Sequence, residues 1–348
     1  MPALVVAVLA KIGAAVAMPL VVTILVLGLL AMTHHTSLPR ITLPQLPTSS
    51  PALSDHGSGF QNPGPCLGTH PKHFSGIAVK KDPRSQLASY NTLIGVKPQI
   101  IEFYNKFRKP FGSWEAKQAV DAGEIPLIQL NPKDVSVKQI ADGVWNRHLT
   151  NYALAVRKFG CTILLSFGHE MNGWWYPWGQ EPAPKPSTSP TDFIRAWRHI
   201  HDIFAAQHVT NVIWSWDPSH QYQQVAPGKV ATPASEWYPG AKYVDWIGLD
   251  GYLGSDTSGR LQNFNEIFSF QLHDIRQFAP HKPIYLAETG VAPGPSATRQ
   301  IAELFAGASA YHLSGLVWFD AVAKHDYRLG IHQDEDVAYR NALKGFVG

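Results

Sequence analysis

The chain has 348 residues, of which 45% are hydrophobic and 16% are charged, and its formal net charge is +3. This composition suits a core-rich globular protein and excludes an intrinsically disordered one. Nucleic-acid binding is disfavoured, because it needs clustered cations and the chain has no dense block of Lys and Arg. The 11 tryptophans predict either a crowded aromatic core or flat platforms for a ligand.

Residues 1–35 are predicted to anchor the chain in a membrane. The run from Ile12 to Met32 carries no charge, and as a helix it would span about 31 Å, close to the ~30 Å hydrocarbon core of a bilayer. It is longer than the ~7–15 apolar residues of a simple signal peptide, and Lys11 precedes it. We therefore expect a signal anchor with its N-terminus in the cytoplasm, with secretion after cleavage near Ala31 as the alternative.

Residues 36–71 are rich in Pro, Ser, Thr and Gly, which predicts an extended, semi-rigid spacer. Residues 72–348 are then expected to form one globular domain that the anchor holds on the extracytoplasmic side of the membrane. The two cysteines, Cys66 and Cys161, lack zinc-ligand spacing. They form either one disulfide or two buried thiols, and the sequence leaves this choice open.

After the spacer, short runs rich in β-branched and aromatic residues alternate with amphipathic segments. Strands are predicted at Phe74–Val79, Ile100–Phe103, Ile125–Leu130, Thr162–Phe167, Asn211–Trp216, Trp246–Asp250, Ile284–Ala287 and Gly315–Phe319. Helices are predicted at 84–94, 113–123, 136–159, 190–207, 262–278, 296–312 and 336–347, and 218–240 is mostly loop.

This alternation predicts an α/β fold with a parallel sheet covered by helices. The strands are almost continuously apolar, as expected for burial on both faces. Eight such units in about 280 residues predict a (β/α)8 TIM barrel. A doubly wound open sheet is the alternative, but no Gly-rich phosphate loop follows the first strand at Val79–Pro83.

Reactive side chains of a TIM barrel lie at the carboxyl ends of its strands. Glu170 follows the fourth predicted strand and Glu288 follows the seventh, so the two can face each other across the barrel mouth. Two opposed carboxylates with aromatic neighbours are what glycoside cleavage requires. One glutamate alone would indicate a helix cap or an ion pair, whereas the pair favours catalysis. His169-Glu170 also begins a zinc-peptidase pattern, but the second histidine is absent, which rejects that class.

The string His169-Glu170-Met171-Asn172-Gly173, followed by Trp175 and Trp178-Gly179, resembles the acid/base motif of glycoside hydrolase family 26. Segments 214–218, 245–252 and 284–290 resemble further motifs of that family, in the expected order, and the likeness spans roughly residues 74–348. The family contains mainly endo-β-mannanases, with some β-glucanases and xylanases. The resemblance therefore implies a polysaccharide substrate and needs no metal or cofactor.

The resemblance also implies roles for individual residues. Glu170 would be the general acid/base and Glu288 the nucleophile. Tyr252 would donate a hydrogen bond to Glu288, and His169 would contact Glu288 or the sugar beside it. The residues expected to bind substrate are His169, Asn172, Trp175, Tyr252, Trp318, Trp178 and Trp216.

Two of these tryptophans carry specific expectations: Trp175 as a sugar platform and Trp318 as the floor under the sugar at the cleavage point. Packing in the barrel core is the competing interpretation for Tyr252 and Trp318, and for Trp178 and Trp216 the two are evenly balanced. The segments before His169 and at the end of the third strand depart from the mannanase pattern, so the sequence leaves β-mannan and β-glucan both open.

The expected mechanism is double displacement with retention, which requires the two carboxyl groups about 5–5.5 Å apart, against about 6.5–9.5 Å for inversion. A monomeric enzyme is expected. Two other functions stay open: an envelope-remodelling transglycosylase, in which a sugar replaces water, and a carbohydrate-binding barrel without activity.

Overall fold

The computed structural model describes residues 73–80, 83–180, 188–220, 232–255 and 259–348. All of these belong to one of the two units into which the chain divides, Asp55–Gly348. The predicted anchor and spacer lie outside the described residues and stay predictions. Among the described helices, none combines the length and apolarity that a membrane crossing requires. Cys161 takes part in a disulfide, and the other cysteine, Cys66, lies outside the described part of the chain.

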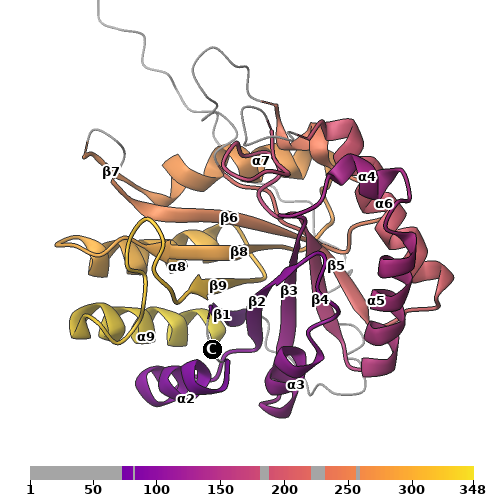
Figure 1. Cartoon of the computed structure of the whole chain (residues 1–348). Helices are drawn as coiled ribbons and strands as arrows, with labels where there is room; N and C mark the ends of the chain where they lie inside the picture. Colours follow the sequence, from indigo (N-terminus) through magenta and orange to yellow (C-terminus); the bar gives the residue numbers. More distant parts are fainter. Residues whose placement is uncertain (1–72, 81–82, 181–187, 221–231, 256–258) are drawn as a thin grey trace, which may run out of the picture. The chain divides into compact units, whose positions relative to one another are not determined.

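The predicted TIM barrel is confirmed: eight parallel strands close into a ring (Figure 1). The strands are β1 (Phe74–Ala78), β2 (Ile100–Lys106), β3 (Ile125–Asn131), β4 (Ile163–Phe167), β5 (Val212–Trp216), β6 (Trp246–Ser255), β8 (Ile284–Val291) and β9 (Gly315–Phe319). Pairing of β5 with β6 and of β9 with β1 completes the ring. A short strand that the sequence did not predict, β7 (Leu261–Gln262), pairs antiparallel with the end of β6.

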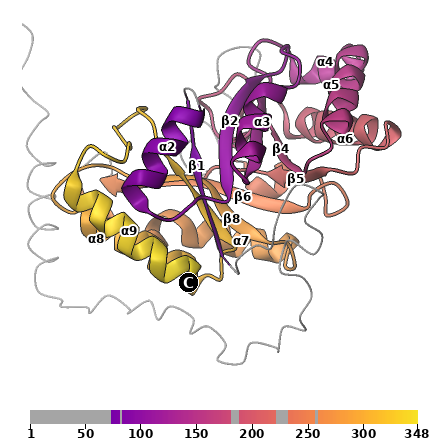
Figure 2. The same cartoon turned by 90° about the horizontal axis from the view of Figure 1, so that it is seen from below.

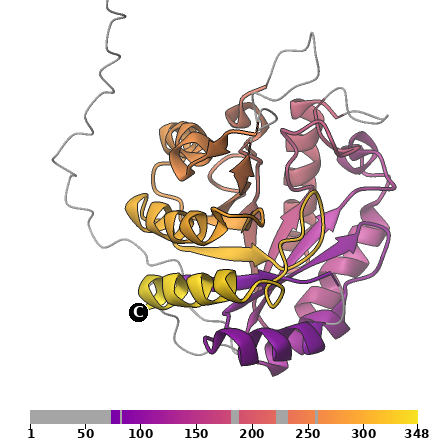
Figure 3. The ribbon, with the colours of Figure 1, turned by 90° about the vertical axis from the view of Figure 1, so that its left-hand side faces the viewer.

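The helices surround the strands (Figure 3), with α8 and α9 side by side (Figure 2). They are α2 (Pro83–Ile94), α3 (Ser113–Asp121), α4 (Val137–Ala141), α5 (Asn146–Phe159), α6 (Pro190–Ala206), α7 (Phe270–Phe278), α8 (Ala297–Ala310) and α9 (Gln333–Val347), with a 3-10 turn η1 (Ala234–Trp237) and a π turn η2 (Asn265–Ser269).

One predicted helix, 136–159, is two helices in the structure. Gly143 lies between α4 and α5 with a φ of 82°, in the left-handed region that ends a helix. By contrast, α6 begins where the sequence indicates, because the Ser189 side chain accepts a hydrogen bond from the backbone of Asp192 and Pro190 takes the first helical position.

The strands bury both of their faces, which explains their continuous apolar character. One face packs against the surrounding helices in the larger hydrophobic cluster. The other face fills the barrel interior with a smaller cluster, built from residues such as Ile100, Leu127, Trp246, Val317 and Phe319. Toward the carboxyl ends of the strands this inner filling changes from apolar to polar, and the candidate site lies there.

Candidate active site

Glu170 stands in the turn that follows β4, and its backbone is strained. Its φ is 53°, in the left-handed region that residues with a Cβ rarely adopt. The backbone N–H of Glu170 donates to the carbonyl of Asp217 at 2.7 Å, and the N–H of Gly173 donates to the carbonyl of Glu170 at 2.9 Å. Such strain costs about 1–3 kcal/mol and clusters at functional sites. The turn thus fixes the backbone position from which the Glu170 side chain extends.

The surroundings of Glu170 favour its protonated form. Burial, together with the nearby charge of Glu288, raises the pKa of Glu170 to about 8. The indole N–H of Trp175, which donates to Oε2 at 2.6 Å, and a hydrogen bond with Ser219 oppose this rise only in part. Glu170 is therefore mainly a neutral acid at pH 7, the form that a proton donor needs.

Glu288 lies in the second half of β8, and its surroundings favour the charged carboxylate more than those of Glu170 do. The hydroxyl of Tyr104 donates to Oε2 and the hydroxyl of Tyr252 donates to Oε1. Burial raises the pKa of Glu288, while these two hydrogen bonds and the charge of Lys80 lower it. Glu288 thus has two phenol donors and a nearby cation, whereas Glu170 has an indole donor, a hydrogen bond with Ser219 and the like charge of its partner. Such unequal surroundings are typical of a pair in which one carboxyl is the acid and the other the charged group.

Tyr104 is a site residue that the sequence analysis missed. It lies on β2, and its ring also packs 5.8 Å from the His169 ring. A signal was present: Glu102 and Tyr104 are polar at alternate positions of a strand that begins with apolar residues, so both point to the same face. That face is the barrel interior.

A second polar layer lies within the barrel and was also missed. The amide of Gln129 donates to Glu102 Oε1 and to Asp217 Oδ2, both at 2.9 Å. The hydroxyl of Ser215 donates to the other oxygen of Asp217 at 2.5 Å. Burial raises the pKa of Asp217 and that of Glu102, the latter well above its ordinary value with the charge of Glu288 adding to the effect. These hydrogen-bonded side chains form the polar layer of the barrel interior next to Glu170 and Glu288.

A cavity of about 460 Å³ joins the two carboxyls at the barrel mouth. Its walls include the indole of Trp175 and the phenol rings of Tyr176, Tyr252 and Tyr327. Aromatic faces of this kind pack against the apolar C–H face of a sugar ring. Of the predicted substrate-binding residues, Trp175 and Tyr252 are therefore on the cavity wall.

His169 and Asn172 do not line the cavity, contrary to prediction. His169 is buried, and its ring nitrogens contact Asn131 Oδ1 at 2.9 Å and the hydroxyl of Tyr176 at 3.3 Å. Burial lowers the pKa of His169 to about 3, so the ring is neutral. The Asn172 carboxamide donates to the carbonyl of Ser219 and accepts from its N–H, both at 2.8 Å. Both side chains are buried and position the loops beside Glu170.

Trp178, Trp216 and Trp318, the other residues expected to bind sugar, do not line the cavity. Each is at most 2% exposed. Trp178 stacks on Tyr176 with ring centroids 4.3 Å apart. Trp216 packs in the outer layer among the aromatic rings of Tyr238 and Phe278.

Trp318 faces away from the barrel interior because its neighbours Val317 and Phe319 take the inward positions of β9. Its ring packs 4.9 Å from Tyr339 of α9, and its N–H donates to the carbonyl of Tyr327 at 2.8 Å. Trp318 therefore anchors α9 and a loop of the barrel mouth, and Tyr327 lines the cavity where the sequence placed Trp318.

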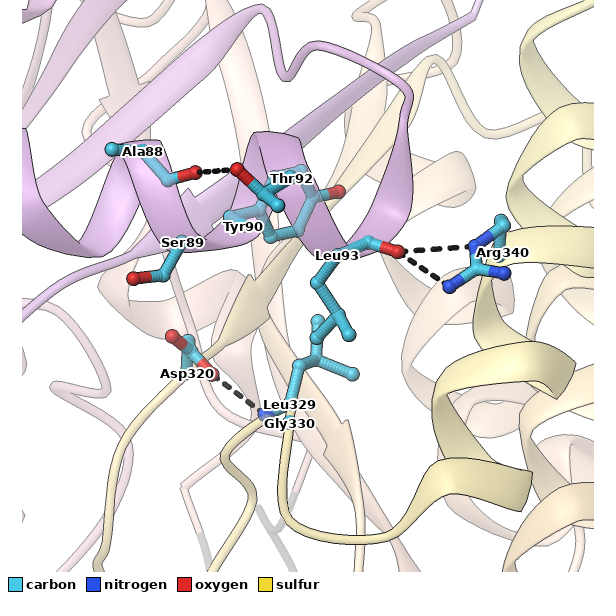
Figure 4. A pocket seen from close by; sticks show the side chains of 9 residues that line it. All are labelled: Ala88, Ser89, Tyr90, Thr92, Leu93, Asp320, Leu329, Gly330 and Arg340. Atoms are coloured by element: carbon cyan, nitrogen blue, oxygen red, sulfur yellow. Dashed lines mark hydrogen bonds between the residues drawn. The ribbon is translucent and has the colours of Figure 1, made fainter.

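A further cavity, of about 660 Å³, lies between α2 and the segment that precedes α9 (Figure 4). Its main polar groups bond to each other: Arg340 donates to the carbonyl of Leu93, and Asp320 Oδ1 accepts from the N–H of Leu329. It has no second carboxyl beside Asp320. The chemistry of a paired acid therefore belongs to the barrel mouth.

No cluster of three or more His, Cys, Asp or Glu side chains suited to a metal ion occurs among the described residues. The candidate site consists of the two carboxyl groups, the side chains that donate hydrogen bonds to them and the aromatic walls of the cavity.

Curated proteins with related sequences include Endoglucanase H of Acetivibrio thermocellus, 29% identical over 301 residues that cover 84% of this chain and 31% of that protein. Mannan endo-1,4-beta-mannosidase A and B of Caldalkalibacillus mannanilyticus is 32% identical over 133 residues, 38% of this chain and 22% of that protein. The chain thus spans less than a third of the length of either relative.

Solved structures show the same fold. A GH26 β-mannanase from Bacteroides ovatus matches with a TM-score of 0.56 and 19% identity, covering 83% of this chain and 92% of that one. A modular endo-β-1,4-mannanase from Cellulomonas fimi matches with a TM-score of 0.58 and 15% identity, covering 78% and 70%. The family model of glycosyl hydrolase family 26 matches residues 87–295, more than half of the chain. The predicted family is therefore confirmed, and the chain belongs to glycosyl hydrolase family 26.

Proposed function

We propose that this chain is a retaining endo-β-glycanase that hydrolyses β-mannan or β-glucan. The observation that carries the proposal is the pair of unequal carboxyls in one aromatic-walled cavity, Glu170 favoured as the acid and Glu288 held by two phenol donors. Membership of the family supports it, as do relatives named as an endoglucanase and a mannan endo-1,4-β-mannosidase. The roles of the two residues are part of the proposal.

In the first step, a carboxylate oxygen of Glu288 attacks the anomeric carbon. The bond from that carbon to the glycosidic oxygen breaks, and Glu170 gives its proton to the departing oxygen. A glycosyl ester on Glu288 and a shortened chain result. In the second step, Glu170 takes a proton from water, the water oxygen attacks the anomeric carbon, and the ester bond breaks to restore the Glu288 carboxylate.

The electrostatics explain how one residue can serve both steps. The charge of Glu288 is one of the causes that raise the pKa of Glu170 to about 8. When Glu288 becomes an ester, that charge disappears, so the pKa of Glu170 falls and the carboxylate becomes available as a base. Esterification of one carboxyl thereby switches the role of the other.

Reducing-end release tests this function directly. The protein would be incubated with mannan, mixed-linkage β-glucan, cellulose and xylan, beside its Glu288→Ala variant. We expect release on mannan or on a glucan, with none in the variant. Elongated products in place of new reducing ends would favour transglycosylation, and the absence of both, with retained polymer binding, would favour a binding barrel.

We also propose that residues 1–35 tether the protein to a membrane, with the enzyme domain on the extracytoplasmic side. This proposal rests on the uncharged run Ile12–Met32 and on the spacer at 36–71. Protease treatment of intact cells, followed by analysis of the membrane fraction, tests it. Recovery of the protein only in the medium, with a new N-terminus near Ala31, would instead establish secretion after cleavage.

A further inference from the structure

The charge on the cavity wall is uneven. Glu170 and Glu288 are the acidic residues among the described ones that line it. On the nucleophile's side, the loop after β9 contributes two basic residues, the exposed Lys324 and the half-buried His325. Binding of a neutral glycan requires no cation, so these two basic residues indicate a ligand with a negative charge.

The loop that carries Lys324 and His325 is an ordered hairpin, residues 320–329, which we call the β9 hairpin. Val322 bridges Asp326 across it, and the N–H of Ala323 donates to the carbonyl of His325 at 2.9 Å. Its ends are tied where the N–H of Leu329 donates to Asp320 Oδ1 at 2.8 Å, a bond drawn in Figure 4. Lys324 and His325 therefore lie on a hairpin that backbone hydrogen bonds hold in place.

The β9 hairpin is also linked to the nucleophile. The ring of Tyr327, at the base of the hairpin, lies 4.7 Å from the ring of Tyr252, whose hydroxyl bonds to Glu288. Lys80, at the end of β1, donates to the carbonyl of Val322 at 3.4 Å and lies over the ring of Phe319 at 4.5 Å. The position of Lys324 and His325 relative to the cleavage point is thus set by packing.

The charge of Lys324 is not neutralised by its own hairpin. The hairpin has two acids. Asp326 is bonded on both carboxylate oxygens by Arg328, at 2.8 and 2.7 Å. Asp320 accepts from the N–H of Leu329 at 2.8 Å and from the amide of Gln86 at 3.0 Å. Within the described part of the chain, no carboxylate forms an ion pair with Lys324. Lys324 lines the cavity and is exposed, so its charge is available to a ligand.

We propose that the enzyme prefers a β-glycan that carries carboxylate groups, and that Lys324 and His325 bind one of these carboxylates on the nucleophile's side of the cleavage point. This inference rests on the proposed function, because it names the substrate class of the same cavity. An anionic chain is repelled by the charge of Glu288, and a cation at the wall offsets that repulsion. Charge-assisted hydrogen bonds to the carboxylate then favour the acidic chain over a neutral one.

Binding measured without turnover tests the inference. The Glu170→Gln variant would be titrated by calorimetry with cellohexaose and mannohexaose, and with the same sugars carboxylated at C6, which adds charge without altering linkage or ring stereochemistry. The same titrations would follow in Glu170→Gln combined with Lys324→Met, and combined with Lys344→Met. Lys344 is an exposed lysine near the end of α9, so this control makes an equal change in net charge.

We expect the carboxylated sugar to bind about 3- to 10-fold more tightly than its neutral counterpart, with the advantage shrinking as salt is raised. Lys324→Met should abolish this advantage of about 3- to 10-fold and leave the affinity for the neutral sugar within about twofold. Lys344→Met should change neither. Equal affinity for both sugars, binding to neither, or an advantage that survives Lys324→Met would overturn the inference. Preferred binding of the acidic sugar with no hydrolysis of any polymer would reject the proposed function and leave this inference standing.

Discussion

Tyr104→Phe is the most informative single change at the site, because it removes one hydroxyl and leaves the ring. The lost hydroxyl donates to Glu288 Oε2, and Tyr252 still donates to Oε1. Both phenol bonds favour the charged form of Glu288, so losing one raises the pKa of that carboxyl further above its ordinary value. The enzyme needs Glu288 ionised, and the acid limb of kcat/KM should therefore move to higher pH.

The size of the shift follows from the burial of the bond. Glu288 is only 8% exposed, so water cannot take the place of the lost donor. A hydrogen bond to a charged group contributes about 1.5–3 kcal/mol, and one pKa unit corresponds to about 1.4 kcal/mol. We expect the acid limb to move up by about 1–2 pH units, which lowers kcat/KM about 10- to 100-fold at a fixed pH on that limb.

The assay is the pH profile of kcat/KM on an aryl glycoside, with the thermal midpoint recorded for each variant. Tyr252→Phe should shift the limb in the same direction. Tyr90→Phe is the matched control, because it also removes a buried phenol hydroxyl, one that bonds to Tyr339 at 3.0 Å away from the cavity. An unchanged acid limb in Tyr104→Phe, or an equal shift in Tyr90→Phe, would refute this account of Glu288.

Four further predictions concern the acid, the barrel interior and helix α9. Glu170→Ala should lower kcat on polysaccharides about 10²–10⁴-fold, and much less on glycosides with activated leaving groups, and equal losses in the two rate measurements would count against an acid role. Since Glu170 works protonated and its pKa is about 8, wild-type kcat/KM should fall as pH rises through about 8, and this limb should vanish in Glu170→Ala. In Gly248→Ala the new Cβ would lie 2.2 Å from Asp217 Oδ1 and 2.5 Å from the Cβ of Ala287, so a loss of about 1–3 kcal/mol of stability should appear as a lower thermal midpoint. Gly345→Ala, with nothing within 4 Å on α9, should raise stability by about 0.5–1 kcal/mol, and a fall in both variants would contradict this interpretation.

The barrel and the position of its two glutamates were predictable, because strand–helix alternation is a local signal and because reactive residues lie at the carboxyl ends of the strands. Each of the eight barrel strands was predicted, with ends displaced by a few residues where polar side chains continue the pairing, as at β8, which runs to Val291. The short strand β7 was not predicted. The break between α4 and α5 was signalled by Gly143, a weak indicator inside an amphipathic pattern.

The direction of individual side chains was harder to predict. Trp318 lies on a strand of five buried residues, and a continuous apolar run does not show which positions face inward. Only the pairing of β9 with its neighbours decides that Val317 and Phe319 take the interior. Tyr104 was missed for a related reason: it meets Glu288 from 184 positions away in the chain, a contact that no local pattern contains.

Trapping the glycosyl-enzyme tests the central claim, that Glu288 forms a covalent bond to the sugar, most directly. A 2-deoxy-2-fluoro glycoside with an activated leaving group would be incubated with the protein, and the modified peptide would be identified by mass spectrometry. The account predicts one sugar per protein, esterified to Glu288, and no adduct in Glu288→Ala. An adduct on a different carboxyl, or a product released with inverted anomeric configuration and no adduct at all, would contradict it.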